Sequence, residues 1–129
     1  MLLSYLQIKN TTTKGRGVFT NQDIETDTIV EVAPVIVLAK NDRENIDKTL
    51  LHDYIFEWGH NTNLCCMALG YVPIYNHAYK SNCEYIMDYD TDSIIIKTIT
   101  SISEGEELTI NYNGDTEDQS PIWFHKNVK

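Results

Sequence analysis

The sequence predicts a single domain that is mainly β, with only short helices. Segments rich in β-branched and aromatic residues recur along its 129 residues, and each is about three to six residues long. Turn-forming residues such as glycine, aspartate, asparagine and serine separate these segments. The strands are expected at Tyr5–Lys9, Val18–Thr20, Thr28–Val32, Val35–Leu38, Tyr85–Tyr89, Ser93–Thr98 and Leu108–Tyr112.

The connections between these strands carry their own signals. Asp90-Thr91-Asp92 lies between two apolar runs and predicts a hairpin. Asn41–His52 begins with capping-type residues and places apolar residues at helical spacing, which predicts a short helix. Asn63–Leu69 is expected to form one or two helical turns.

Length and composition indicate one domain over residues 1–129, with its core at about 5–113. The tail at 114–129 is polar except for Pro121-Ile122-Trp123-Phe124, whose two large aromatic residues are expected to dock onto the domain. The longest apolar stretch, Thr28–Ala39, is interrupted by charge and by proline, so we expect no membrane span. The N-terminal residues lack the pattern of a signal peptide, so we expect an intracellular protein, cytoplasmic or nuclear.

The net charge of −9 argues against direct nucleic-acid binding, because an acidic surface repels phosphates and attracts basic partners. On charge alone, simple solubility is the better explanation. The cysteines, Cys65, Cys66 and Cys83, are odd in number and form no C-x-x-C pair, so we expect buried free thiols. No metal site is expected, since the histidines show no i,i+4 pairing.

Three segments could carry chemistry. Gly15-Arg16-Gly17-Val18-Phe19 lets the backbone turn sharply or approach a ligand, although such a glycine pair is more often only a turn. Asn76-His77-Ala78-Tyr79-Lys80-Ser81-Asn82 crowds polar side chains after an apolar run, as in an irregular loop or a polar pocket floor. Glu104-Gly105-Glu106-Glu107 is an acidic turn that leads into a strand ending at Tyr112. This tyrosine is either a residue of the core or a residue that takes part in catalysis.

In this order, the three segments resemble the motifs of the SET-domain protein-lysine methyltransferases. The first is similar to that family's G-x-G motif, Asn76-His77…Asn82 to its N-H-S-x-x-P-N segment, and Gly105-Glu106-Glu107-Leu108…Tyr112 to its G-E-E-L-x-x-D-Y segment. Asp53-Tyr54-Ile55-Phe56-Glu57-Trp58 also resembles the compact bacterial and viral members. The resemblance covers roughly residues 5 to 124.

The resemblance implies a SET-domain fold of several small twisted sheets with a C-terminal pseudoknot, and transfer of a methyl group from S-adenosylmethionine to a lysine of a basic protein, such as a histone or ribosomal protein. Tyr112 is then the catalytic centre and Tyr54 a second residue of the lysine channel, which Tyr75 is also expected to line. The lysine amine must be neutral to attack the methyl group, whereas free lysine has a pKa of ~10.4 and is protonated at neutral pH. An apolar channel disfavours the charged ammonium and so favours the neutral amine. The implied cofactor-binding residues are Lys14, Gly15, Arg16, Gly17, Asn76, His77 and Trp123.

The sequence departs from the family pattern at several positions. Ala78 replaces a serine, Ser81 a proline and Asn111 an aspartate, and no cysteine-rich zinc module follows Tyr112. Without that module, either Trp123 and Phe124 close the site alone or a second subunit contributes to it. A homodimer is therefore one of the two expectations. We weigh three alternatives: an active methyltransferase, a SET-like module that binds cofactor or peptide without turnover, and a generic β-rich interaction domain.

Overall fold

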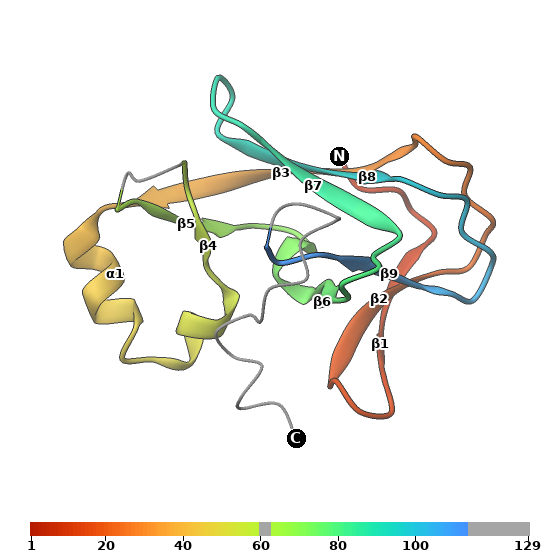
Figure 1. Cartoon of the computed structure of the whole chain (residues 1–129), viewed down its shortest axis with the longest axis horizontal. Helices are drawn as coiled ribbons and strands as arrows, with labels where there is room; N and C mark the ends of the chain where they lie inside the picture. The colour runs from red at the N-terminus through yellow and green to blue at the C-terminus, as the bar shows by residue number, and fades with distance from the viewer. Residues whose placement is uncertain (60–62, 114–129) are drawn as a thin grey trace.

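The computed structural model describes residues 1–59 and 63–113 (Figure 1). Over these residues the chain consists mainly of strands, joined by one α-helix and two 3₁₀ helices. The strands are β1 (Leu6–Asn10), β2 (Arg16–Thr20), β3 (Ile29–Leu38), β4 (Phe56–Glu57), β5 (Cys65–Ala68), β6 (Asn76–His77), β7 (Cys83–Asp88), β8 (Ser93–Thr98) and β9 (Glu107–Ile110); the helices are α1 (Lys40–Ile46), η1 (Leu50–Tyr54) and η2 (Val72–Ile74). The mainly β prediction is therefore confirmed.

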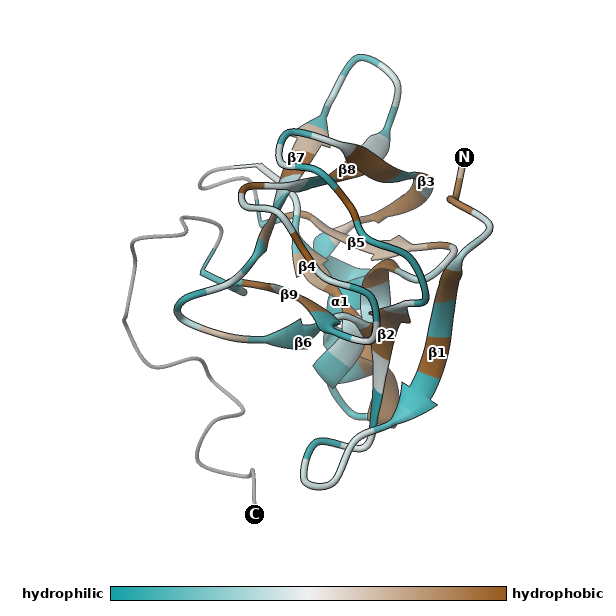
Figure 2. Cartoon of the chain, turned by 90° about the vertical axis from the view of Figure 1, so that its right-hand side faces the viewer, coloured by the Kyte–Doolittle hydropathy of each residue, from teal (hydrophilic) through white to brown (hydrophobic). Residues whose placement is uncertain are grey.

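The strands form two sheets that share one core. One sheet has the order β1-β2-β9-β6 and the other β4-β5-β3-β8-β7. Val18 and Leu108 of the first sheet are fully buried in the same cluster as Val30 and Ile96 of the second. Figure 2 shows apolar residues on strands of both sheets, whereas the loops between strands are largely hydrophilic. Burial of this shared apolar surface holds the two small sheets together.

The position of β9 follows from pairing with segments that lie far away in the sequence. It pairs antiparallel with β2 on one side and parallel with β6 on the other, with Asn76 opposite Thr109 and His77 opposite Ile110. Figure 2 shows β9 beside β6. β9 thus lies between two segments that precede it in the sequence, as the predicted pseudoknot requires.

The Asn82 side chain extends this pairing along the edge of β9. Its Oδ1 accepts from the Thr109 N–H at 2.8 Å, and its Nδ2 donates to the Glu107 carbonyl at 2.8 Å. An asparagine side chain carries the same donor and acceptor as a peptide group, so here it replaces part of a neighbouring strand. A proline before Asn82 is not needed for this, because Ser81 is buried and its hydroxyl donates to the Cys83 carbonyl at 2.9 Å.

The predicted helical turns at Asn63–Leu69 are wrong, because this segment forms β5. Cys65 and Cys66 are both fully buried, and β5 pairs with both β4 and β3. Pairing with distant strands therefore determines the conformation of this segment, because its local preference for helix or strand is weak. The prediction of buried free thiols is confirmed for all three cysteines.

The two strands expected at Thr28–Val32 and Val35–Leu38 are one continuous strand, β3. Its first half pairs with β8 and its second half with β5, and Pro34 lies where the partner changes. Proline lacks an N–H donor and is tolerated at such a junction, where its carbonyl still accepts from the Leu69 N–H at 3.0 Å.

The remaining local predictions agree with the structure, except that β9 ends at Ile110 and Tyr112 lies two residues beyond the strand that was expected to end there. The hairpin at Asp90-Thr91-Asp92 joins β7 to β8, and Asp88 accepts from the N–H groups of Asp90 and Thr91. The expected short helix is α1, which is followed by η1. Among the described residues, no helix has the length and apolar character needed to cross a membrane.

We predict that Asn82→Ala destabilises the fold by about 2 kcal/mol or more, because it leaves two partly buried backbone groups of β9 without their partner. Denaturant unfolding measures this free energy. The matched control is Asn45→Ala on the exposed side of α1, which should change stability by less than about 0.5 kcal/mol. Equal effects of the two substitutions would contradict the strand-replacing role of Asn82.

Candidate active site

A cavity of about 270 Å³ lies where the first sheet meets η1 and η2. Several of its lining residues are distant in sequence but belong to the three motifs described above. It is lined by Lys14, Gly15, Arg16, Asp53, Tyr54, Pro73, Ile74, Asn76 and Tyr112. Of the residues predicted from the sequence, Lys14, Gly15, Arg16, Asn76, Tyr54 and Tyr112 thus share one cavity. Asp53, Pro73 and Ile74 also line the cavity but are not among the predicted site residues. The only sequence signal for them is their proximity to Tyr54 and Asn76.

The sheet order explains why these residues meet. Lys14 and Gly15 directly precede β2, Asn76 begins β6, and Tyr112 follows β9 by two residues. Since β9 lies between β2 and β6, the ends of these strands are neighbours in space. Residues nearly a hundred positions apart therefore line one wall.

Tyr112 is held at three points. Its hydroxyl donates a hydrogen bond to the Tyr75 carbonyl, and its backbone N–H donates to Nδ1 of His77 at 3.0 Å. Its carbonyl accepts from the Tyr85 hydroxyl at 3.2 Å. Burial, together with the nearby Tyr54, raises the pKa of Tyr112 well above its usual range. The phenol is therefore neutral at physiological pH and unsuited to act as a base.

Aromatic side chains surround Tyr112 and fix its ring. Phe56 meets it edge-on at a centroid distance of 6.4 Å and also contacts Tyr85 at 5.3 Å. The His77 ring lies 5.2 Å from the Tyr112 ring. Neither Phe56 nor Tyr85 is identifiable as a site residue from the sequence, where the only signal for Phe56 is its place two residues after Tyr54. Such edge-to-face pairs add rigidity as well as buried apolar area.

Asn76 joins three strands. Its Nδ2 donates to the Arg16 carbonyl at 3.0 Å and to Oε2 of Glu107 at 2.7 Å. Gly17 allows this close approach, because a Cβ there would lie 2.3 Å from Glu107 Oε2 and 2.9 Å from Asn76 Nδ2. Gly17 and His77 are not among the lining residues of the cavity: one makes room for the network, and the other orients Tyr112.

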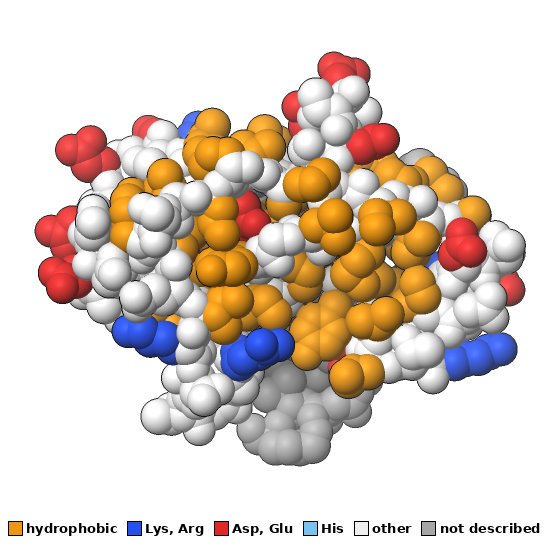
Figure 3. All heavy atoms as spheres, turned by 180° about the vertical axis from the view of Figure 1, so that it is seen from behind, with side chains coloured by type: hydrophobic (Ala, Val, Ile, Leu, Met, Phe, Trp, Pro, Cys, Tyr) orange, Lys and Arg blue, Asp and Glu red, His pale blue; other side chains and the backbone are white. Residues whose placement is uncertain are grey.

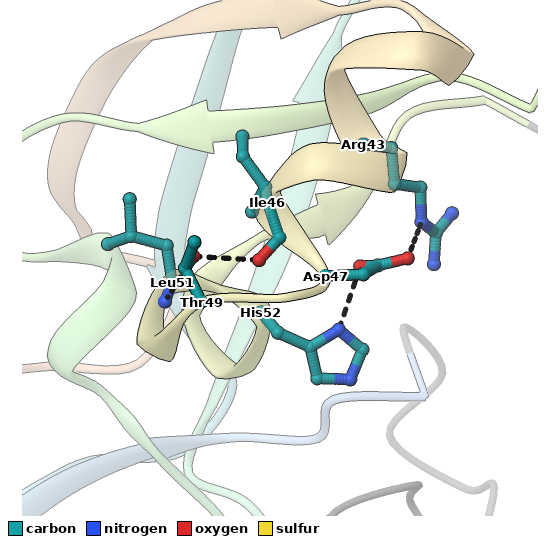
Figure 4. A network of polar contacts seen from close by, with 6 residues as sticks. All are labelled: Arg43, Ile46, Asp47, Thr49, Leu51 and His52. Carbon is teal, nitrogen blue, oxygen red and sulfur yellow. Dashed lines mark hydrogen bonds and ion pairs between the residues drawn. The ribbon is translucent and has the colours of Figure 1, made fainter.

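A network of polar contacts connects α1 to η1, the 3₁₀ helix that ends at Tyr54 (Figure 4). The Thr49 hydroxyl caps η1 by accepting from the Leu51 N–H at 3.2 Å. Asp47 then links η1 to α1, because His52 Nδ1 lies 2.8 Å from its carboxylate and Arg43 lies 3.9 Å away. These contacts involve the same short helix, η1, whose last two residues, Asp53 and Tyr54, line the cavity.

The expectation that Tyr75 lines the channel is wrong. Its ring is fully buried, and its hydroxyl donates to Oε1 of Glu31 at 2.9 Å. Only its backbone carbonyl reaches the Tyr112 hydroxyl. Residue type alone cannot reveal this, because the 3₁₀ helix η2 ends immediately before Tyr75 and the Tyr75 side chain is buried in the core.

The loop that departs from the family motif is nevertheless well bonded. The Ala78 N–H donates to the Ile110 carbonyl at 3.0 Å and so extends the β6–β9 ladder by one residue. Asn111 is buried, and its side chain donates to the Tyr79 carbonyl at 3.4 Å and accepts from the Asn113 N–H at 3.0 Å. Trp123 and Phe124, which were expected to cover the site, lie outside the described residues.

A SET domain model matches residues 15–113 of this sequence. The match spans most of the chain, so the chain belongs to the SET domain family.

Two histone-lysine methyltransferases are similar to it over most of its length. The histone-lysine N-methyltransferase of Schizosaccharomyces pombe that is specific for H3 lysine 37 is 32% identical over 125 residues, which cover 96% of this chain and 80% of that protein. The histone-lysine N-methyltransferase SETD7 of Halocynthia roretzi is 27% identical over 135 residues, which cover 89% of this chain but only 34% of that protein.

Solved structures support the fold. A Plasmodium falciparum protein assigned as a histone methyltransferase superposes with a TM-score of 0.63 at 23% identity, over 86% of this chain and 95% of that one. A chain of a humanized mutant of the Chaetomium thermophilum Polycomb Repressive Complex 2 superposes with a TM-score of 0.67 at 20% identity, over 83% of this chain and 14% of that one. The SET fold predicted from the motifs is therefore confirmed.

We predict that Gly17→Ala destabilises the protein by about 1–3 kcal/mol, since its Cβ would displace the hydrogen-bonded Glu107 and Asn76 side chains. Denaturant unfolding of Gly17→Ala in the wild-type and Glu107→Ala backgrounds tests the cause. Much of the cost should disappear when the Glu107 carboxylate is absent. The same cost in both backgrounds would show that the close approach is not what requires glycine.

The buried tyrosines also predict a loss of stability in alkali. Burial raises the pKa of Tyr85 to about 12, whereas a tyrosine in the unfolded chain titrates near ~10. The folded state therefore keeps a proton that the unfolded state loses, so stability should fall as the pH rises above ~10 and should go on falling up to the folded pKa. Unfolding free energies measured from about pH 8 upward should decline less steeply in Tyr85→Phe. Identical declines would contradict this origin.

Proposed function

We propose that this chain is a protein-lysine N-methyltransferase that uses S-adenosylmethionine as its methyl donor. The observation that carries the proposal is the cavity, which joins the Lys14–Arg16 turn and Asn76 to a neutral Tyr112 whose hydroxyl hydrogen is already engaged. The membership of the SET family and the similarity to two histone-lysine methyltransferases support the same activity.

The lining residues suit the cofactor. Lys14 and Arg16 bring positive charge that matches a carboxylate, and Asp53 brings negative charge that matches an ammonium or ribose hydroxyl groups. Gly15 adopts a positive φ of 74° with open space where a Cβ would stand, so the backbone is accessible to a ligand. When bound, S-adenosylmethionine would supply an electrophilic methyl group on a sulfonium.

The chain's own contribution is alignment and desolvation. An in-line displacement by an amine depends chiefly on correct positioning, which can account for several kcal/mol of the barrier. In this proposal the oxygen of Tyr112 orients the lysine amine, because its hydrogen is donated to the Tyr75 carbonyl and its lone pairs stay available. Tyr54, Pro73 and Ile74 provide largely apolar walls that favour the neutral amine over the ammonium.

Charge supports the choice of a basic protein as substrate. The net charge of −9 favours association with a lysine-rich partner such as a histone or ribosomal protein. The similar Schizosaccharomyces pombe enzyme is named for its action on histone H3. An intracellular site of action belongs to the same proposal.

We predict that Tyr112→Phe lowers methyl transfer by at least about tenfold, because the oxygen that orients the amine is lost while the ring keeps its packing. The measurement is transfer of labelled methyl from S-adenosylmethionine to a mixture of basic proteins including histones. Tyr89→Phe is the matched control, since Tyr89 is exposed on the β7–β8 hairpin and contacts Trp58 instead of the cavity. Transfer that Tyr112→Phe leaves unchanged would contradict the assignment.

Cofactor binding is tested separately by Asn76→Ala. Loss of its bonds to Arg16 and Glu107 should weaken calorimetric binding of S-adenosylmethionine at least about tenfold. Asn45→Ala on α1 serves as the control. Cofactor binding without methyl transfer in the wild type would favour the binding module over the enzyme, and unchanged affinity in Asn76→Ala would remove this residue from the site.

A further inference from the structure

Glu31 is a buried carboxylate far from any catalytic motif in the sequence. It lies on β3 and is only 2% exposed. The register of β3 against β8 shifts between Ile29 and Glu31, which is a β-bulge. The bulge lets the adjacent residues Val30 and Glu31 both face the interior, whereas regular alternation would send one of them outward.

The carboxylate sits in a fitted pocket of hydrogen-bond donors. Its Oε2 accepts from the Tyr71 N–H at 2.8 Å, and its Oε1 accepts from the Tyr75 hydroxyl at 2.9 Å. Gly70, at a φ of 75°, makes room for it, since a Cβ there would lie 2.3 Å from Oε2. Both donors are neutral, and burial raises the pKa of Glu31 above its usual range. Placing an acidic group here is costly, and an apolar residue would fill the space more cheaply.

Tyr75 connects this carboxylate to the cavity. One end of the residue, its hydroxyl, is bound by Glu31; the other end, its backbone carbonyl, accepts the hydrogen bond of the Tyr112 hydroxyl. The Tyr75 ring between them is fully buried and closely packed, so a displacement of its hydroxyl is transmitted through the rigid ring to its backbone. The orientation of the Tyr112 hydroxyl therefore depends on where Glu31 holds Tyr75.

We propose that Glu31 and Tyr75 are positioning residues for the methyl-transfer reaction: they fix the carbonyl that engages the Tyr112 hydroxyl hydrogen and so aim the oxygen of Tyr112 at the substrate amine. This inference rests on the proposed function. It assigns a role in the reaction to two residues that do not line the cavity. It also gives a functional reason for a buried carboxylate that is unfavourable for stability.

The test is a double-variant cycle on kcat. Tyr75→Phe removes one oxygen and keeps the buried ring, and it should lower kcat about tenfold while KM for the protein substrate and Kd for the cofactor change less than about twofold. Glu31→Gln keeps the shape but loses the charge-assisted bond, and it should give a smaller fall in kcat. In a Tyr112→Phe background neither change should lower kcat further, because both act through the missing hydroxyl. The control is Glu44→Gln on the exposed face of α1.

A second measurement works without turnover. In protein labelled with carbon-13 at the tyrosine Cζ, the Tyr112 signal is identified by its loss in Tyr112→Phe. Tyr75→Phe and Glu31→Gln should both shift that signal, whereas Glu44→Gln should not. An unmoved Tyr112 signal, an unchanged kcat, or equal falls in kcat in the two backgrounds would overturn the inference. If the wild type transfers no methyl group, the proposed function fails, and the Cζ signal alone then decides whether Glu31 and Tyr75 orient Tyr112.

Discussion

The parallel pairing of β6 with β9 is the constraint on which the rest of the site depends. Only two residue pairs make it, Asn76 with Thr109 and His77 with Ile110, so it could not persist alone. Asn82 extends it with a side chain that replaces backbone, and Ala78 adds one more ladder bond. Through this pairing the chain closes a loop of about thirty residues at the point where the cavity lies.

Partly buried polar contacts and aromatic packing together set the geometry around Tyr112. The hydroxyl, N–H and carbonyl of this residue are all bonded, to Tyr75, His77 and Tyr85 respectively. The three partners are themselves in contact with other side chains: Tyr75 with Glu31, Tyr85 with the Phe56 ring and His77 with the Tyr79 ring. A network of this kind favours one arrangement, since breaking any of these bonds leaves a partly buried polar group without that partner. Such rigidity suits a reaction that is governed by alignment.

The sequence allowed much of the fold to be predicted, because short β-branched segments and turn residues report strands and hairpins directly. It failed at Asn63–Leu69, where pairing with β3 and β4 outweighs local preference, and it divided β3 at Pro34, where the strand changes partner.

The site residues also divide into those that local sequence motifs reveal and those whose roles depend on long-range contacts. Residues inside motifs, such as Asn76 and Tyr112, could be named in advance. Glu31, Phe56 and Tyr85 could not, because their roles arise from contacts between distant strands, and a glutamate in a β-rich segment looks like a solvated residue. Tyr75 was assigned to the channel for its residue type, and only the three-dimensional path of η2 shows its side chain turned into the core.

A titration of isotopically labelled protein with S-adenosylhomocysteine, followed through its backbone amide signals, tests the central claim most directly. This compound is what remains of the cofactor after methyl transfer, so it binds without needing a substrate. The strand arrangement predicts that signals of Lys14, Gly15, Arg16, Asn76 and Tyr112 shift together, with one affinity, while those of the β7–β8 hairpin stay in place. Shifts confined to the hairpin, or absence of shifts at Asn76 and Tyr112 under saturation, would contradict the assembly of one cofactor site from these segments.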